Sequence, residues 1–368
     1  MCGKQHKITF GMKFQDFIKI INKELEVVKQ NIGRIVLVAN VRNKKPLNNN
    51  FIFNEADVSE QFSEEEYNQI IKGIKLSGFN LHLIYYNEID LIKDIINKKI
   101  KNNNTLVYNL IRNGHIYSRK CLMPAFLEFI NFPYTCSNSL TVSLCRNKYY
   151  VMKLLQSHNI RVPETYIYKK NNNTLPNIKF PFIIKDIMGA ASTGMSSDSI
   201  VFNNKEFNKK ISLARAKMNE TLVLQQFIEG MECEVPVFIY KDDIIVMEPV
   251  GIAIEGKKRA NNNILTYECS YNDDYDFFSL ENEISKETLN EIKQLALKTT
   301  KLLKIKNYGR IDFRISPEGT PYIIDISTTP YTTIHSSFVF AFKNNGLPYE
   351  KIYQSIIVNS YLSHEYDK

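Results

Sequence analysis

Oxygen-bearing side chains alternate with apolar ones near the carboxyl end of this 368-residue chain. Arg310 and Asp312 lie two residues apart, a Ser-Pro-Glu-Gly turn follows at 316–319, and Asp325 and Ser327 lie beyond it. Because strand side chains alternate between two faces, pairing these runs as a hairpin brings the four side chains together. Such oxygen ligands suit Mg²⁺, which binds one or two carboxylates plus substrate phosphates, and an arginine suits developing negative charge. The alternative is a solvated hairpin with an Arg–Asp ion pair.

A second set of residues could bind phosphate. Lys185 ends an apolar run, and the small-residue loop 189–195 follows it. Backbone N–H groups of such a loop can contact phosphate oxygens, and a lysine adds a point charge. The spacing is not that of a Walker A motif and no G-x-G-x-x-G is present, so P-loop and Rossmann sites are excluded. The alternative is a flexible surface loop.

Two further segments are ambiguous when each is considered alone. Lys148 begins a predicted helix, where a lysine is usually exposed to solvent. The segment 225–232 places polar groups at a strand end, where they could bind an adenine edge and a ribose, although an edge strand with a turn would look the same. His335 and Ser336 are adjacent, but no third group accompanies them, so a catalytic triad is rejected.

Composition indicates an ordinary globular protein of two or three domains, with 44% hydrophobic and 23% charged residues. The net charge of +8 is spread along the chain without a dense basic block, so a basic cleft is favoured over nucleic-acid binding. The six cysteines are scattered without metal-ligand spacing, which favours reduced thiols. No signal core and no apolar run of membrane-spanning length is found, so we expect a cytoplasmic protein.

Periodicity predicts the elements that must position these residues, and strand–helix alternation over about 30–140 predicts an open α/β domain. Helices are expected at 12–31, 64–76, 88–100, 121–130, 148–158, 207–216, 284–303 and 349–362. Strands are expected at 35–39, 81–86, 105–110, 180–185, 221–227, 232–240, 243–252 and in the hairpin 308–327. Residues 46–53 are expected to form a loop, and the polar stretch 255–279 a long functional loop.

In their order and spacing these motifs resemble the ATP-grasp fold, and within it the D-alanine–D-alanine ligase family. The motifs that carry the resemblance are Lys148, Phe180-Pro181 to Lys185, the loop 189–195, Leu224 to Glu232, Gly309 to Asp312, and Asp325 to Pro330. The similarity runs from about Thr105 to the carboxyl end. It implies an α/β (α+β) chain with an N-terminal extension (1–33), an α/β domain (34–140), and central (141–220) and C-terminal (221–368) ATP-grasp subdomains.

The resemblance also implies a role for each motif in a ligase that joins a small carboxylate to an amine through an acyl-phosphate. ATP would be bound by Lys148, Lys185, Gly189, Ser192, Thr193, Gly194, Gln225, Gln226, Phe227, Ile228 and Glu232. Mg²⁺, with Mn²⁺ as an alternative, would be held by Asp312, Asp325 and Ser327. The catalytic groups would be Arg310, Ser192 and Tyr271. Substrate contacts would come from Ser336, Tyr331 and His115. A homodimer is left open.

The chain departs from the family pattern at several of these positions. Ser327 stands where the family usually has asparagine, Tyr331 where it has glycine, and Ser270 where it has lysine. Arg119 and Lys120 occupy the place of an acidic pair. Positive charge there would repel an ammonium, so the sequence predicts that D-alanine is not the preferred donor and acceptor. It favours a donor with an extra carboxylate or with an acylated amine. The alternatives are an ordinary D-alanine–D-alanine ligase and a nucleotide-binding homologue with little catalysis.

Overall fold

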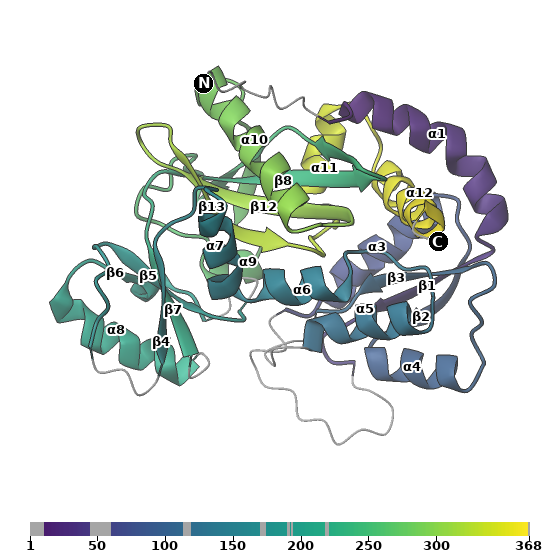
Figure 1. The fold of residues 1–368 in the computed structure, drawn as a ribbon, viewed down its shortest axis with the longest axis horizontal. Helices are drawn as coiled ribbons and strands as arrows, with labels where there is room; N and C mark the ends of the chain where they lie inside the picture. Colours follow the sequence, from purple (N-terminus) through teal and green to yellow (C-terminus); the bar gives the residue numbers. More distant parts are fainter. Residues whose placement is uncertain are drawn as a thin grey trace, which may run out of the picture.

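The computed structural model of the chain describes residues 11–44, 60–112, 119–169, 174–189, 192, 194–217 and 221–366. These residues form three sheets with helices packed around them (Figure 1). The predicted loop 46–53 and the predicted site residues Thr193 and His115 lie outside the described residues. Within the described segments no helix is long and apolar enough to cross a membrane.

The first sheet is parallel and has the order β2-β1-β3. Its strands are β1 (Arg34–Ala39), β2 (Leu81–Tyr85) and β3 (Thr105–Leu110), and its helices are α3 (Glu64–Leu76), α4 (Glu88–Ile96) and α5 (Arg119–Phe129). The predicted alternation of strands and helices is confirmed. Strands β1 and β3 are buried along nearly their whole length, as expected for parallel strands covered on both faces, and this explains their continuous apolar runs. Asn40 and Arg112 follow β1 and β3, so both lie at the carboxyl edge, where open α/β sheets bind ligands.

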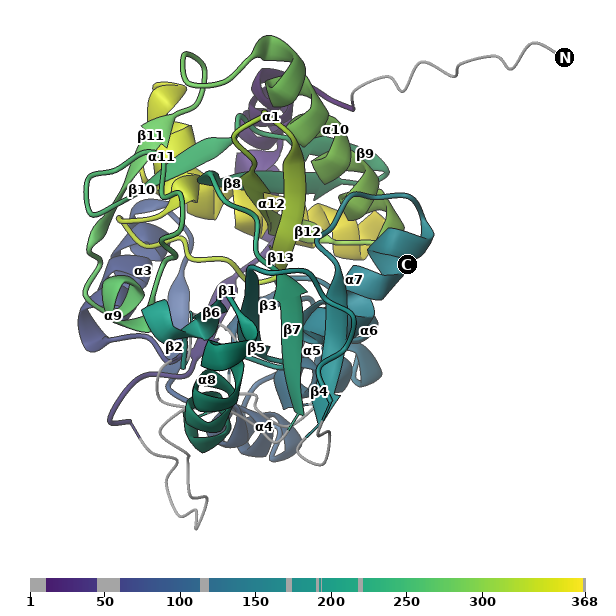
Figure 2. The same ribbon diagram turned by 90° about the vertical axis from the view of Figure 1, so that its left-hand side faces the viewer.

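The second sheet has the order β4-β7-β5-β6 and is antiparallel throughout (Figure 2). Its elements are β4 (Thr165–Lys169), β5 (Phe182–Asp186), the 3₁₀ turn 197–199, β6 (Ile200–Val201), α8 (Asn204–Lys217) and β7 (Thr221–Gln226). The strand expected at 180–185 begins only after Pro181, and β4 was not predicted. This sheet and α8 bury an apolar cluster of their own, which includes Phe182 and Phe207.

The third sheet contains six strands in the order β11-β10-β8-β12-β13, with β9 also paired to β8. Its strands are β8 (Met231–Tyr240), β9 (Asp243–Val246), β10 (Val250–Ile254), β11 (Tyr275–Ser279), β12 (Asn307–Ile315) and β13 (Pro321–Ser327). The accompanying helices are α6 (Ser139–Arg146), α7 (Lys148–Ser157), α9 (Tyr267–Tyr271), α10 (Lys286–Leu302), α11 (Ser337–Asn344) and α12 (Glu350–Tyr366).

Two predictions for this region are corrected. The single strand expected at 243–252 is two strands, β9 and β10, because Pro249 between them has no N–H to donate to a ladder. The stretch 255–279, expected to be one irregular loop, contains α9 and β11. Thr266 caps α9, so this helix depends on a local polar side chain. Strand β11 pairs with β10, so it depends on a partner distant in the sequence. Helices α6 and α11 were not predicted.

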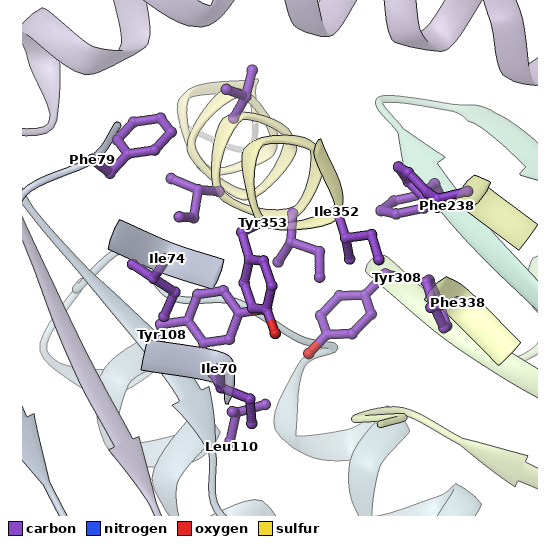
Figure 3. Close-up of a cluster of buried hydrophobic side chains, with 14 of the residues drawn as sticks. Ile70, Ile74, Phe79, Tyr108, Leu110, Phe238, Tyr308, Phe338, Ile352 and Tyr353 are labelled. Atoms are coloured by element: carbon purple, nitrogen blue, oxygen red, sulfur yellow. The ribbon is translucent and has the colours of Figure 1, made fainter. Parts of the chain in front are cut away.

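One apolar core joins the first and third sheets. Its members come from the N-terminal helix α1 (Phe14–Asn31), from α3, from both sheets and from α12. Figure 3 shows Tyr353 of α12 directed between Tyr108 of β3 and Tyr308 of β12. The ring of Phe17 lies 5.0 Å from that of Phe238, which ties α1 to β8. The wall that these two sheets form is therefore one packing unit.

Replacement of Gly73 tests this shared core. A Cβ at Gly73 in α3 would lie 2.1 Å from the ring of Tyr353, so α12 packs against α3 only because this side chain is absent. We expect Gly73→Ala to lower the free energy of unfolding by about 1–3 kcal/mol, the cost of overpacking, although alanine favours helix. Urea unfolding measures the change. Gly33→Ala is the matched control, since its nearest contact would be 3.6 Å, and equal stability of both variants would contradict the shared core.

Candidate active site

A cleft of about 430 Å³ runs between the three sheets. Of the predicted site residues, its walls include Lys148, Lys185, Gly189, Ser192, Gln225, Gln226, Phe227, Ile228, Glu232, Tyr271, Arg310, Asp312, Asp325, Ser327 and Tyr331. Gly194 and Ser336 are not among its lining residues. Residues far apart in the sequence are thus brought to one cavity, as a binding site requires.

Strand pairing aligns the charged groups of the predicted hairpin. In the β12–β13 ladder Asp312 lies opposite Asp325, and Arg310 lies opposite Ser327. The proximity predicted from their alternation is therefore confirmed. On its other side β12 pairs with β8, which places Glu234 opposite Asp312. One sheet face thus carries carboxylates from three neighbouring strands.

Arg310 is held by two of these carboxylates. Its Nε and Nη2 donate to the Oδ1 and Oδ2 of Asp312 at 2.7 and 2.8 Å, and Nη2 lies 3.1 Å from Oε1 of Glu234. Burial would lower the pKa of Arg310, but Asp312 and Glu234 hold it above its usual value. Burial raises the pKa of Glu234 to about 7 despite the opposing effect of Arg310. Glu234 was not predicted, and its only sequence signal is the alternation of Glu232 and Glu234 with apolar residues.

The two predicted phosphate-binding lysines have protein partners in this structure. Nζ of Lys148 lies 2.6 Å from Oδ2 of Asp325. Nζ of Lys185 donates to Oε1 of Gln225 at 2.8 Å, and Nε2 of Gln225 donates to Oγ1 of Thr165 at 3.2 Å. Burial and the neighbouring Lys148 lower the pKa of Lys185 to about 8. Lys185 therefore has a neutral partner and a buried charge, a combination that favours an anionic ligand.

Glu232, the predicted ribose contact, forms a buried ion pair with Arg314. Nη1 of Arg314 donates to Oε1 of Glu232 at 2.5 Å, and its Nη2 donates to the carbonyl oxygen of Asn261 at 2.9 Å. The guanidinium also lies 4.6 Å from the ring centroid of Phe227. Arg314 had no predicted role. It fixes Glu232 and the segment around Asn261 beside the predicted adenine-binding strand end, and the ribose contact stays a prediction.

The small-residue loop is tied to the segment that precedes α9. Oγ of Ser192 donates to the carbonyl oxygen of Leu265 at 2.7 Å. The backbone N–H of Tyr267 donates to the carbonyl oxygen of Met195 at 3.0 Å. At the other end of α9, the guanidinium of Arg42 lies 4.2 Å from the ring centroid of Tyr271. Contacts at both ends of α9 thus link the second sheet to the first. The catalytic roles of Ser192 and Tyr271 stay predictions.

The predicted substrate residues have different surroundings. Tyr331 is partly buried and packs against Arg112, whose guanidinium lies 3.9 Å from its ring centroid. Burial raises the pKa of Tyr331 to about 12. Ser336 is an N-cap, because its Oγ accepts the N–H of Val339 at 3.3 Å and donates to the carbonyl oxygen of Thr333 at 2.7 Å. Its substrate contact stays a prediction, while Thr333 and His335 line the cleft beside it.

The carboxylate oxygens of Asp312 on β12 and Asp325 on β13 suit Mg²⁺ as ligands. Within the described residues no three His, Cys, Asp or Glu side chains are grouped to hold a metal ion. Asp312 and Asp325 nevertheless lie opposite each other, and each has a cationic side chain, Arg310 or Lys148, as its counter-charge. Two facing carboxylates are what Mg²⁺ requires when substrate phosphates complete its coordination. A role for Ser327 stays a prediction.

Comparisons with known proteins place this geometry in a family. The family model described as D-ala D-ala ligase C-terminus matches residues 150–358. D-alanine–D-alanine ligase B of Clostridium perfringens is 28% identical over 290 residues, which cover 75% of this chain and 90% of the relative. D-alanine–D-alanine ligase of Aquifex aeolicus is 26% identical over 280 residues, covering 75% of this chain and 89% of the relative.

Solved structures show the same fold. The D-alanine–D-alanine ligase of Bacillus anthracis complexed with ATP superposes with a TM-score of 0.68 at 19% identity, covering 91% of this chain and 99% of that one. The enzyme of Coxiella burnetii superposes with a TM-score of 0.64 at 14% identity, covering 91% and 96%. With a family model matching more than half of its length, the chain belongs to the D-alanine–D-alanine ligase family of the ATP-grasp superfamily and is an ATP-dependent, ADP-forming carboxylate–amine ligase.

Proposed function

We propose that the chain joins the carboxylate of one amino acid to the amine of a second, with D-alanine as the first candidate for both. The observation that carries the proposal is that Arg310, Asp312, Asp325, Lys148 and Lys185 line the same cleft. The names of the relatives favour D-alanine over the sequence-based prediction of another preferred donor. The ordinary D-alanine–D-alanine ligase, the alternative in that analysis, is therefore the better-supported reading.

The chain's own residues supply binding, orientation and charge for the reaction. Lys148 and Lys185 neutralise ATP phosphates, and the segment containing α9 covers the cleft and limits access of water. ATP phosphorylates the donor carboxylate, and the acceptor amine then attacks the acyl-phosphate and releases phosphate. Arg310 faces the charge that develops on the oxygens of this centre. Asp312 and Asp325 would hold Mg²⁺, which supplies charge neutralisation for the phosphates.

Acceptors for the ammonium groups of amino acids are present in the cleft. Glu65 and Glu66, at the start of α3, are among its lining residues. Glu65 is exposed, while Glu66 accepts the N–H of Ser63 at 2.6 Å in a capping box. The sequence-based argument rested on the positive charge of Arg119 and Lys120 in place of an acidic pair. These two glutamates weaken that argument and are compatible with D-alanine.

Steady-state ADP release tests the proposal directly. With ATP and Mg²⁺, D-alanine alone should drive ADP release above the rate without amino acid, and mass spectrometry should detect the dipeptide. L-alanine at the same concentration is the control. ATP binding without ADP release for any amino-acid pair would instead identify a nucleotide-binding homologue with little catalysis.

Lys185 is expected to dominate ATP binding, since its buried charge has no carboxylate partner within hydrogen-bonding distance among the described residues. Lys185→Ala should weaken ATP binding by more than about fivefold in Kd, beyond the ~1 kcal/mol upper limit for an exposed ion pair. Isothermal titration calorimetry measures the change, with the exposed Lys179→Ala as the matched control.

The pH dependence of ATP binding gives a second test of Lys185. A pKa of about 8 means that Lys185 is mostly charged at pH 7 and mostly neutral at pH 9. A neutral amine no longer attracts phosphate, so ATP affinity should fall as the pH rises from 7 to 9. Lys185→Arg keeps its charge over this range and should flatten the profile. An unchanged affinity in Lys185→Ala at pH 7 would show that the phosphates lie elsewhere.

Asp312 and Asp325 are expected to be required for Mg²⁺-dependent turnover. Asp312→Asn and Asp325→Asn remove one ligand charge each, and ADP formation should fall at least about 100-fold with the far-ultraviolet circular dichroism unchanged. Excess chelator should abolish wild-type turnover. Glu318→Gln, at the exposed turn of the same hairpin, is the control. Wild-type rates in either aspartate variant would remove these residues from the metal site.

A further inference from the structure

A buried arginine lies where Glu232 meets the predicted adenine-binding segment. Arg314 of β12 lines the cleft, is 3% exposed and belongs to neither the proposed phosphate site nor the proposed metal site. Charged side chains are seldom buried to this degree unless a partner compensates them. A buried ion pair adds little net stability compared with apolar side chains, so the pair of Arg314 with Glu232 is better explained by positioning than by stability.

The register of β12 and β8 relates this arginine to the proposed metal site. Asp312 and Arg314 are two residues apart on β12, so their side chains share one face of the sheet. Their partners across the β8 ladder are Glu234 and Glu232, respectively. With a rise of about 3.3 Å per residue, the two rungs of this ladder are about 7 Å apart. A nucleotide with its outer phosphates at Asp312 can therefore place its sugar at Glu232.

Arg314 fixes the orientation of Glu232 and leaves one of its oxygens for a ligand. Nη1 of Arg314 donates to Oε1 of Glu232 at 2.5 Å and to the carbonyl oxygen of Asn263 at 3.1 Å. Nη2 donates to the carbonyl oxygen of Asn261 at 2.9 Å. A planar guanidinium that binds three acceptors at once has a fixed orientation. Oε2 of Glu232 accepts no hydrogen bond from any residue that the structure describes, so this oxygen is available to a ligand.

An apolar surface that suits a nucleobase adjoins this carboxylate. The ring centroid of Phe227 lies 4.6 Å from the guanidinium of Arg314. Phe227 belongs to a buried apolar cluster with Ile183 and Ile264, against which Met195 packs. These four apolar side chains all line the cleft, and apolar walls suit the flat face of a purine. One arginine thus contacts both the wall for a base and the acceptor for a sugar hydroxyl.

We infer that Arg314 is a positioning residue that makes nucleotide binding selective for an intact ribose. It holds Glu232 so that Oε2 accepts hydrogen bonds from the hydroxyl groups of the sugar. Through the carbonyl oxygens of Asn261 and Asn263, it also holds the segment that leads to α9 beside the base. The inference rests on the proposed ATP-dependent function, deepens only its nucleotide site, and leaves D-alanine as the amino-acid substrate.

Binding of nucleotides that lack one sugar hydroxyl tests the inference. Calorimetry without amino acid gives the Kd of ATP, 2′-deoxy-ATP and 3′-deoxy-ATP. The wild-type chain should bind ATP about tenfold or more tightly than at least one analogue, the effect of one hydrogen bond to a charged acceptor. Arg314→Lys keeps the charge but cannot bind three acceptors as a planar fork, so this Kd ratio should fall below about threefold. Glu232→Gln should lower it in the same direction, and the double variant should lose no more, since both changes remove one contact.

A matched arginine outside the cleft is the control. Nη1 of Arg161 lies 2.6 Å from Oε1 of Glu291, and Arg161→Lys should leave the Kd ratio unchanged. If the wild-type chain binds ATP and both analogues equally, or if Arg314→Lys weakens all three by the same factor, Arg314 has only a structural role and the inference is wrong. The proposed ligase function is judged separately, because it fails only if D-alanine does not drive ADP release by the wild-type chain.

Discussion

The active cleft depends on the register of β12 between β8 and β13. This register places Asp312 between Glu234 on one side and Asp325 on the other, with Arg310 two residues away. Three neighbouring carboxylates on one sheet face would repel one another if they were buried alone. The bidentate contact of Arg310 with Asp312, together with its contact to Glu234, makes the arrangement stable. A slip of one residue in β12 would turn these side chains to the opposite face.

The protein supplies its own counter-charges where substrates are expected to bind. Lys148 pairs with Asp325, and Arg310 pairs with Asp312, so both carboxylates are compensated without a bound ion. If Asp312 and Asp325 hold Mg²⁺ and Lys148 binds the ATP phosphates as proposed, these partners would be exchanged when substrate binds. Such an exchange would cost less than creating charges in a low-dielectric cleft, because the carboxylates would be paired before and after it.

Periodicity identified most of the fold and most of the candidate site, and its failures have a common physical cause. Strong local patterns such as those of β1, α3 and β3 were predicted almost to the residue, as was the juxtaposition of Asp312 and Asp325 within one hairpin. The contact of Arg112 with Thr329, which are 217 positions apart, and the pair of Glu60 with Arg146, which are 86 apart, depend on tertiary packing. No local signal in one sequence reports such contacts.

Tyr331 connects the wall of the cleft to the loops of the first sheet. Its partly buried ring packs against Phe62 and Arg112 of the first sheet's loops. This contact adds to the apolar core that already joins the first and third sheets. The β4–β7–β5–β6 sheet has a separate core and borders the cleft from the other side. Opening of the cleft therefore breaks fewest buried contacts when that sheet moves and the wall containing Tyr331 and Arg112 stays fixed. The wall that joins the first and third sheets is thus the rigid side of the cleft.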